Sequence, residues 1–213
     1  MGQSAYKIPG RDGSLYEGQC SRTGKYHGKG KLKYEDGSCF EGEFENGMPI
    51  DGLFTYKNGD TYQGTLKNCR PEGFGKWTNS QGIYEGNFKD AKFVNGTIHF
   101  RDGSRYKGFM QNGKRHGPTS EYIFSNGDKF MGQFEDDQFV EGVYENVSGE
   151  RYEGEFKDGK MDGRGKLFVG DKLAYEGDFK DDLFHGKGKL YKHEKGVVYD
   201  GQFFEGKRHG RAF

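Results

Sequence analysis

The chain of 213 residues is polar, with hydrophobic and charged residues each at 31%. A composition this polar does not fill a thick two-layer core, and on hydropathy alone it would favour disorder. Against disorder, 19 Phe and 14 Tyr raise the aromatic content to 16%, and 38 Gly accompany only 4 Pro. The composition therefore favours regular β structure with many tight turns and one aromatic face.

The charge balance and the cysteines argue against a nucleic-acid partner and a zinc site. Lys plus Arg and Asp plus Glu both number 33, and because nucleic-acid binders usually show a basic excess, we predict no nucleic-acid partner. Cys20, Cys39 and Cys69 fit no zinc motif and are predicted to be free thiols of a cytoplasmic protein. No apolar leader follows Met1 and no run approaches about 18 apolar residues, so neither a signal peptide nor a membrane span is predicted.

Residues 1–15 form the first predicted segment, and they end in the second half of a repeat closed by Asp12-Gly13. From residue 16 onward, an aromatic residue followed two positions later by Gly recurs at a nearly constant spacing. Such a period indicates a repeat array, which we place over residues 16–213 as eight full repeats and a partial ninth. The recurring aromatics are Tyr16, Phe40, Tyr62, Tyr84, Tyr106, Phe130, Tyr152, Tyr175 and Tyr199.

The first repeat, residues 16–37, has the plan of a β-hairpin. Tyr16, Gly18 and Cys20 alternate with polar residues, which predicts a strand. A turn over 21–25 leads into a second alternation, and Asp36-Gly37 closes the unit with a hairpin signal. The later repeats follow the same plan. We therefore predict an all-β fold, an elongated, twisted, single-layer antiparallel sheet of tandem hairpins.

The two faces of this sheet are predicted to differ. Glycine weakens a strand, so its alternation with aromatics on one face suggests that each ring lies over a glycine of an adjacent strand. On the other face, first strands carry acids such as Glu17 and Glu41, and second strands carry bases such as Lys29 and Lys31. Antiparallel pairing would place these charges side by side, stabilising the sheet by about 0.2–1 kcal/mol per pair.

The segment from Tyr152 to Leu167 resembles a MORN (membrane occupation and recognition nexus) repeat. It shows the family pattern of aromatic-x-Gly-x-aromatic, a glycine turn and then Gly-x-Gly, and residues 175–190 show it too. The resemblance covers about residues 16 to 213. It implies the hairpin fold more specifically than it implies a function, because unrelated roles share this fold.

Four repeats depart from the family pattern. The second Gly of Gly-x-Gly is replaced by Phe54, Ile98, Thr119 and Tyr144, and Pro118 favours a local bulge. Two interpretations stay open: the larger side chains compensate in the core, or they line an aromatic groove for a partner. Under the second, the candidate partner-binding residues are Phe44, Phe54, Phe88, Tyr106, Phe134 and Tyr144.

Repeated histidines and two basic clusters are the remaining candidates for chemistry. His27, His116, His185 and His209 share one repeat position, which favours a structural role over catalysis or metal binding. No catalytic residue, metal or cofactor is predicted. The basic clusters lie at predicted turns and are either solvated or a patch for lipid headgroups or other anions. Their members are Lys114, Arg115, Lys207, Arg208 and Arg211.

These features favour a non-enzymatic scaffold of a cytoskeletal assembly. Small all-MORN chains resemble components of the radial spoke head in the ciliary axoneme, or of cytoskeletal collars in parasites and ciliates. The radial spoke head is the favoured assignment, and it would make other MORN-repeat or spoke-head subunits the partners. Terminal strand edges would allow a homo- or hetero-oligomer. The alternative is a membrane-proximal adaptor that binds anionic phospholipids, against which the zero net charge counts. A regulatory part of a lipid kinase or methyltransferase would require a catalytic domain that these residues do not show.

Overall fold

The computed structural model describes residues 6–192 and 196–212, and their regular structure is entirely β-strand. The chain divides into two compact units, residues 1–101 (unit 1) and residues 102–213 (unit 2). Unit 1 contains β1 (Tyr6–Pro9), β2 (Leu15–Cys20), β3 (Tyr26–Lys33), β4 (Cys39–Glu45), β5 (Met48–Thr55), β6 (Thr61–Lys67), β7 (Arg70–Thr78), β8 (Gly82–Lys89) and β9 (Lys92–Phe100). Unit 2 contains β10 (Arg105–Gln111), β11 (Lys114–Ile123), β12 (Lys129–Glu135), β13 (Gln138–Glu145), β14 (Glu150–Lys157), β15 (Lys160–Val169), β16 (Lys172–Lys180), β17 (Leu183–Lys192), β18 (Gly196–Phe204) and β19 (Lys207–Ala212).

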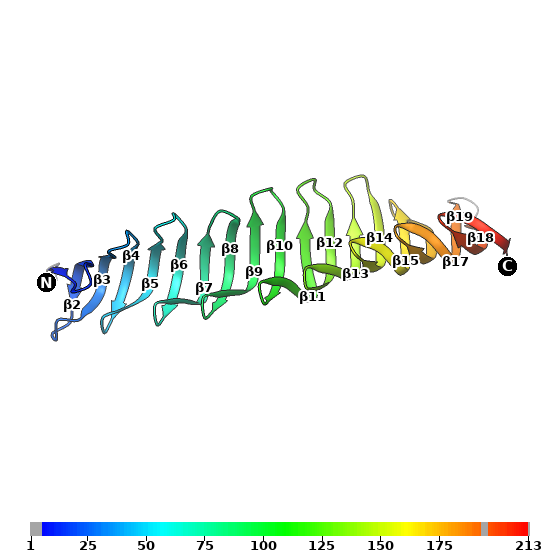
Figure 1. The fold of residues 1–213 in the computed structure, drawn as a ribbon. Helices are drawn as coiled ribbons and strands as arrows, with labels where there is room; N and C mark the ends of the chain where they lie inside the picture. The colour runs from blue at the N-terminus through cyan, green and yellow to red at the C-terminus, as the bar shows by residue number, and fades with distance from the viewer. Residues whose placement is uncertain (1–5, 193–195, 213) are drawn as a thin grey trace. The chain divides into compact units, whose positions relative to one another are not determined.

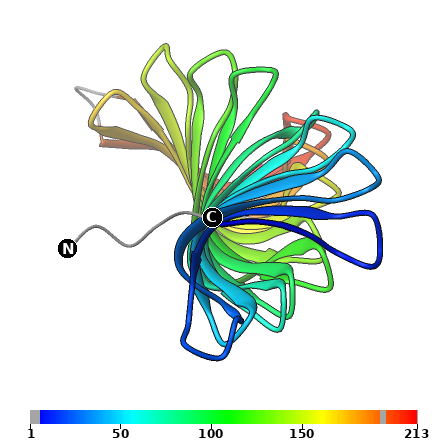
Figure 2. The same cartoon turned by 90° about the vertical axis from the view of Figure 1, so that its left-hand side faces the viewer.

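Within each unit, every strand pairs antiparallel with the next strand along the chain. Figure 1 shows the hairpins of each unit side by side in one layer, and Figure 2 shows that successive hairpins of a unit are rotated relative to one another. This rotation is expected from the right-handed twist of β-strands. The predicted all-β fold of tandem antiparallel hairpins is therefore confirmed.

A row of glycines crosses the strands of each unit, because the register places glycine opposite glycine. In unit 1 the row runs through Gly18, Gly30, Gly42, Gly52, Gly64, Gly75, Gly86 and Gly96. In unit 2 it runs from Ser120 through Gly132, Gly142, Gly154, Gly165, Gly177, Gly188 and Gly201 to Ala212.

This register corrects one sequence interpretation. Phe54 pairs with Phe40 and Tyr62, so it does not replace a row glycine; Gly52 occupies that place. Ile98 and Tyr144 likewise lie two positions beyond Gly96 and Gly142, and Ser120 rather than Thr119 stands in the row. The Gly-x-Gly positions of these repeats were matched wrongly from the sequence because the turns differ in length.

Turn length explains the misalignment. Row glycines are closer together in sequence across the turns of β4–β5, β8–β9 and β12–β13 than across those of β2–β3, β6–β7, β14–β15 and β16–β17. In the longer turns an additional glycine, such as Gly28 or Gly163, has a positive φ beside the register shift. A register shift between Gly117 and Ser120 also confirms the irregularity predicted at Pro118.

The predicted first segment, residues 1–15, lies within unit 1. β1 pairs with β2 so that Ile8 is opposite Tyr16, which is how a preceding half-repeat would pair. Residues 1–5 of this segment lie outside the described residues. The division of the chain at residues 15 and 16 stays a prediction.

Candidate functional site

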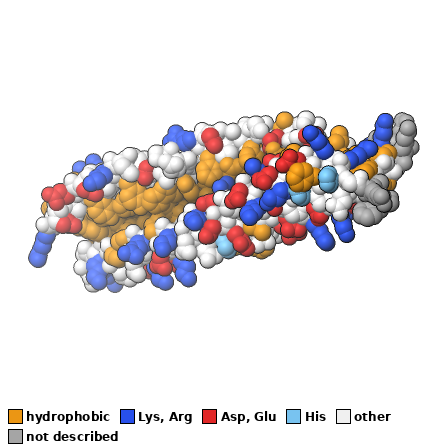
Figure 3. All heavy atoms as spheres, turned by 45° about the vertical axis from the view of Figure 1, so that its right-hand side comes forward, with side chains coloured by type: hydrophobic (Ala, Val, Ile, Leu, Met, Phe, Trp, Pro, Cys, Tyr) orange, Lys and Arg blue, Asp and Glu red, His pale blue; other side chains and the backbone are white. Residues whose placement is uncertain are grey.

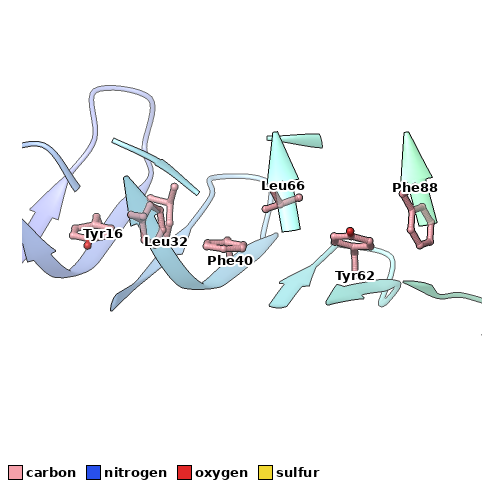
Figure 4. Close-up of a cluster of buried hydrophobic side chains, with 7 residues drawn as sticks. Tyr16, Leu32, Phe40, Tyr62, Leu66 and Phe88 are labelled. Carbon is pink, nitrogen blue, oxygen red and sulfur yellow. The ribbon is translucent and has the colours of Figure 1, made fainter. Parts of the chain in front are cut away.

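The first aromatic ring of most repeats lies directly on the glycine row. A Cβ atom added to Gly30 would stand 2.6 Å from two atoms of the Tyr16 ring, which is closer than real Cβ contacts come. The Tyr16 hydroxyl donates a hydrogen bond of 2.6 Å to the carbonyl oxygen of Gln19, and Tyr62 donates to Thr65 in the same way. Figure 4 shows the rings of Tyr16, Phe40 and Tyr62 following one another along unit 1. The predicted packing of rings over glycine is confirmed.

A second ring in most repeats interlocks the neighbouring first rings. The Phe44 ring stands edge-on to Tyr16 at 5.1 Å and to Phe40 at 5.2 Å between ring centroids. In unit 2 the same edge-on contacts continue through Phe130, Phe134, Phe156, Tyr152, Phe179, Tyr175, Phe203 and Tyr199. Each such pair contributes about 0.5–1.5 kcal/mol beyond area burial. Within each unit, a single layer thus holds an aromatic core.

The six predicted partner-binding residues fall into two groups. Phe44, Phe88, Tyr106 and Phe134 are core residues with at most 5% of their surface exposed, so a partner cannot touch these rings directly. Phe54 and Tyr144 are partly exposed. Partner binding by the six residues stays a prediction. Because the other four rings are buried, a partner could touch only Phe54 and Tyr144 directly.

Tyr144 is also tied to the fold by its hydroxyl. It donates a hydrogen bond of 2.5 Å to Oδ2 of the buried Asp128, which also accepts bonds from Asn126 and the backbone N–H of Val147. The pKa of Asp128 is held below its ordinary value, first by the Tyr144 hydroxyl. Burial, with the Asp128 carboxylate, raises the pKa of Tyr144 to about 12. Tyr144 therefore anchors a turn as well as presenting an edge of its ring.

Unit 1 carries an aromatic strip of which only Phe54 was predicted to bind a partner. We define it as Tyr34, Phe54, Tyr56, Trp77 and Tyr84, all partly exposed. Successive ring centroids from Tyr34 to Trp77 are 5.6, 4.4 and 5.1 Å apart. Figure 3 shows hydrophobic side chains gathered in one continuous strip over this unit, bordered on both sides by polar atoms. The sequence does contain a pattern that predicts most of the strip: an aromatic residue follows the row glycine of β3, β5 and β7 by two or four positions. The pattern was missed because the repeats were aligned on the wrong glycines.

The opposite face shows the predicted pairing of acids with bases at some of its strands. Lys31 stands between Glu17 and Glu41 in the register, and its Nζ lies 2.8 Å from Oε2 of Glu41. That hydrogen bond, and the charge behind it, raise the pKa of Lys31. In unit 2, Lys189 stands between Glu176 and Asp200. Elsewhere on this face acids stand opposite acids, as Glu43 does with Asp51 and Glu141 with Glu155.

The first predicted basic cluster is paired within unit 2. Arg115 donates from Nε to Oδ1 of Asp137 at 2.8 Å, and its backbone N–H donates to the same oxygen. Its guanidinium also lies 5.0 Å from the centroid of the Tyr122 ring. Lys114 lies 3.6 Å from Asp136. Both cations thus join the turn of β10–β11 to the turn of β12–β13.

The second basic cluster lies on β19, separated from β11 by seven strands, or about 35–40 Å at the spacing of a sheet. Arg208 lies over the Tyr199 ring at 5.0 Å, and Lys207 is exposed. The side chain of Arg211 lies outside the described residues. The structure therefore does not bring the two clusters together, and anion binding by them stays a prediction.

The repeated histidines do not share one environment. His116 has a buried Nδ1 without a hydrogen-bond partner, 4.0 Å from Asp136, whereas His185 and His209 flank the Phe204 ring. In the described part of the chain, no three His, Cys, Asp or Glu side chains gather as metal ligands would. The three cysteines carry free thiols. No helix suited to crossing a bilayer occurs over residues 6–192 and 196–212.

Comparison with known proteins identifies the repeat. The sequence model described as "MORN repeat" matches residues 22–39, 40–49, 84–105, 106–118, 152–169, 175–193 and 199–212, which is more than half of the chain. No curated protein matches the sequence.

Two solved structures show a distant likeness. The G-box domain of the microcephaly protein CPAP is 13% identical, with a TM-score of 0.34 and coverage of 91% of this chain and 95% of that one. The wild-type TCP10 domain of Danio rerio CPAP is 14% identical, with a TM-score of 0.34 and coverage of 93% and 100%. At such TM-scores these likenesses carry no functional argument.

Proposed function

Because the chain belongs to the MORN-repeat family, we propose that it is a non-enzymatic protein-interaction scaffold of a cytoskeletal assembly. The observation that carries the proposal is the aromatic strip of unit 1. Large aromatic side chains are enriched where proteins bind proteins, and a contiguous apolar strip with polar borders is typical of such a site. The rings that pack on the glycine row are buried in the core, so the strip is the contiguous aromatic surface that unit 1 offers to a partner.

The charged face supports the same proposal. Where bases stand between acids, as Lys31 does between Glu17 and Glu41, their charges offset one another across the strands. Charges paired in this way give little attraction to an anionic membrane or to nucleic acid. A protein partner that contacts the aromatic rings therefore fits this surface better than a nucleic acid or a charged bilayer does.

Within this proposal, the more specific assignment is the radial spoke head of the ciliary axoneme. It is supported only by the resemblance of this chain to small all-MORN proteins. The partners would then be spoke-head or other MORN-repeat subunits. Proximity labelling in ciliated cells supports the assignment if axonemal proteins are enriched, and overturns it if labelling is confined to non-ciliary proteins.

Affinity purification of the tagged chain tests the broader proposal. The strip variant Tyr34→Ser/Tyr56→Ser should lose cytoskeletal partner proteins that the wild type recovers, while circular dichroism shows that the β-sheet content is retained. The matched control is Tyr191→Ser, which changes a partly exposed tyrosine of β17, outside the strip. Partner recovery that is equal for all three proteins contradicts the role of the strip, and a partner set without cytoskeletal proteins contradicts the scaffold.

A further inference from the structure

The aromatic strip offers rings together with hydrogen-bond donors that the fold does not use. Among the described residues, neither the hydroxyls of Tyr34 and Tyr56 nor the Nε1–H of Trp77 has a hydrogen-bond partner within the chain, and none of these atoms is buried. Tyr16 and Tyr62, by contrast, use their hydroxyls on their own strands. The strip therefore presents three unused donors at its surface, side by side with stacked or tilted rings.

This chemistry complements a polypeptide that has acceptors and no donors. A proline-rich segment in the polyproline II conformation lacks N–H groups at its prolines and leaves its carbonyl oxygens unpaired. Its pyrrolidine rings pack on aromatic side chains, and tyrosine or tryptophan donors bind its carbonyls, as in aromatic-lined grooves that recognise such segments. An amphipathic helix, whose carbonyls are already bonded within the helix, would offer these donors no free backbone acceptor.

The spacing of the rings fits the same ligand. The steps from Tyr34 to Phe54 to Tyr56 to Trp77 are 5.6, 4.4 and 5.1 Å between centroids. Polyproline II rises about 3.1 Å per residue, so this stretch matches about five residues of the ligand. The strip runs from the end of β3 past β5 and β7 to β8, so a ligand would lie across the strands rather than extend the edge of the sheet.

The border of the strip is acidic. Asp12, Asp36 and Asp60 form no ion pair among the described residues, and the first two act electrostatically on Tyr34 while Asp60 acts on Tyr56. Lys57 is the cation that faces Asp36 and offsets its charge in part. Two carboxylates, Asp12 and Asp60, are thus left to attract a cation of the ligand.

From donors, rings, spacing and charge we infer that the strip binds a proline-rich segment in the polyproline II conformation with a Lys or Arg beside its prolines. This inference rests on the proposed scaffold function and names the chemistry of one partner. Because a proline-rich segment is already extended before it binds, it loses less conformational entropy on binding.

Trp77 makes the inference directly measurable, because it is the single tryptophan of the chain. The probe is a synthetic peptide, Arg-Lys-Pro-Pro-Leu-Pro-Pro-Leu-Pro, titrated into the full-length protein while Trp77 fluorescence is followed. The first comparison peptide has alanine in place of every proline, and the second has Glu in place of Arg and Lys. We expect a saturable change with the first peptide, binding at least tenfold weaker with the alanine peptide, and weaker binding with the acidic one.

Two conservative variants separate recognition from folding. Tyr56→Phe keeps the ring and removes one unused donor, so binding should weaken roughly 3–10-fold while the melting temperature stays that of the wild type. Tyr26→Phe is the matched control, since Tyr26 also lies in unit 1 but stacks on Tyr16 outside the strip.

Three results overturn the inference: no saturable change with the proline peptide up to millimolar concentration, equal binding of the alanine peptide, or unchanged binding by both Tyr34→Phe and Tyr56→Phe. The scaffold proposal fails separately, through partner recovery in the affinity purification. A negative peptide titration with intact partner recovery removes the polyproline ligand and leaves the scaffold.

Discussion

Glycine and aromatic side chains act together at the residue scale. The Tyr16 ring occupies the volume that a side chain at Gly30 or Gly18 would fill, and its hydroxyl caps a carbonyl of its own strand. The contact lowers ring exposure to zero without a second layer of structure. Phe40 shows that the ring alone suffices, because it packs over Gly42 and Gly52 without a hydroxyl.

Replacing a row glycine tests this packing. We predict that Gly30→Ala lowers the free energy of unfolding by about 1–3 kcal/mol, because its Cβ overlaps the Tyr16 ring and forces both to shift. Gly37→Ala is the control: its Cβ would meet nothing within 4 Å, and only its positive φ costs about 1–2 kcal/mol. In the Tyr16→Leu background the Gly30→Ala cost should shrink and the Gly37→Ala cost should not. Equal costs in both backgrounds, measured by urea denaturation, would contradict ring overlap.

Two tyrosines that the fold partly removes from water, the buried Tyr62 and the partly exposed Tyr34, predict a loss of stability at alkaline pH. Burial raises the pKa of Tyr34 and of Tyr62 from 10.0 to about 12. In the unfolded chain these groups ionise near pH 10, so their contribution to stability is complete below pH 10 and is lost as the pH rises towards about 12. Thermal melts between pH 8 and 12 should show this fall. Tyr62→Phe should have a shallower decline than the wild type, and an identical decline would exclude the Tyr62 phenol as a cause.

At the residue scale the sequence predicted much of the core and little of the strip. Alternation of aromatic and glycine was enough to predict ring-over-glycine contacts, because both residues recur at fixed spacing. The strip was missed because turn length decides which rings of other repeats lie beside a residue such as Tyr56. The exposure of Phe54, against the burial of Phe44, depends on how neighbouring rings cover each position, which a single-strand pattern does not contain.

At the scale of strands and turns, glycine pairing is kept constant while turn length varies. The turn between Gly42 and Gly52 is shorter than that between Gly18 and Gly30, yet both glycine pairs stay opposite. A register shift near each turn absorbs the difference. Sequence alone could predict hairpins from the Asp-Gly and Asn-Gly signals, but the length of the bulged turns followed only from the three-dimensional register.

Neighbouring hairpins are also joined through their turns. The backbone N–H of Asp137 donates to the carbonyl oxygen of Arg115, and that of Asp182 donates to Met161 in the same manner. Burial alone would raise the pKa of Asp137, but the hydrogen bonds from Arg115 hold it below the ordinary value. The cations predicted to bind anions therefore serve first to connect consecutive repeats.

A double-mutant cycle tests this connection between turns. Arg115→Ala, Asp137→Ala and the double variant should give a coupling energy of about 1 kcal/mol, because the pair combines an ion pair with a backbone hydrogen bond. The matched pair Lys114 and Asp136, 3.6 Å apart and exposed, should couple by less than about 0.5 kcal/mol. A larger coupling energy for Lys114 and Asp136 than for Arg115 and Asp137 would contradict the view that Arg115 connects the two turns.

At the scale of the whole molecule, the net charge is zero because acids and bases are equal in number, and some of them are paired across strands. The family assignment follows from repeats matched along more than half of the chain, and the scaffold role is proposed from the aromatic strip and these pairs. Sequence analysis could predict the family and the two-faced sheet because both patterns recur along the chain. A partner is recognised by one local surface, so periodicity could not identify it.

Liposome flotation tests the membrane alternative for the whole chain. We predict no binding at physiological salt to phosphatidylcholine vesicles that contain phosphatidylserine and phosphoinositide, because Lys114 and Arg115 are already paired. The positive control is the same chain extended at its C-terminus by a run of lysines. Flotation of the wild type that requires the anionic lipids would replace the scaffold proposal by a membrane adaptor.

The most direct test of ring-over-glycine packing is the proton NMR shift of the glycine Hα atoms. A proton facing an aromatic ring is shielded, so Gly18 and Gly30 should each have one Hα far upfield of its random-coil position. In the Tyr16→Leu variant those two shifts should return towards random coil, while Gly64 and Gly75 beneath Tyr62 keep theirs. Unshifted Hα protons in the wild type, or shifts that persist after Tyr16 is replaced, would contradict the account.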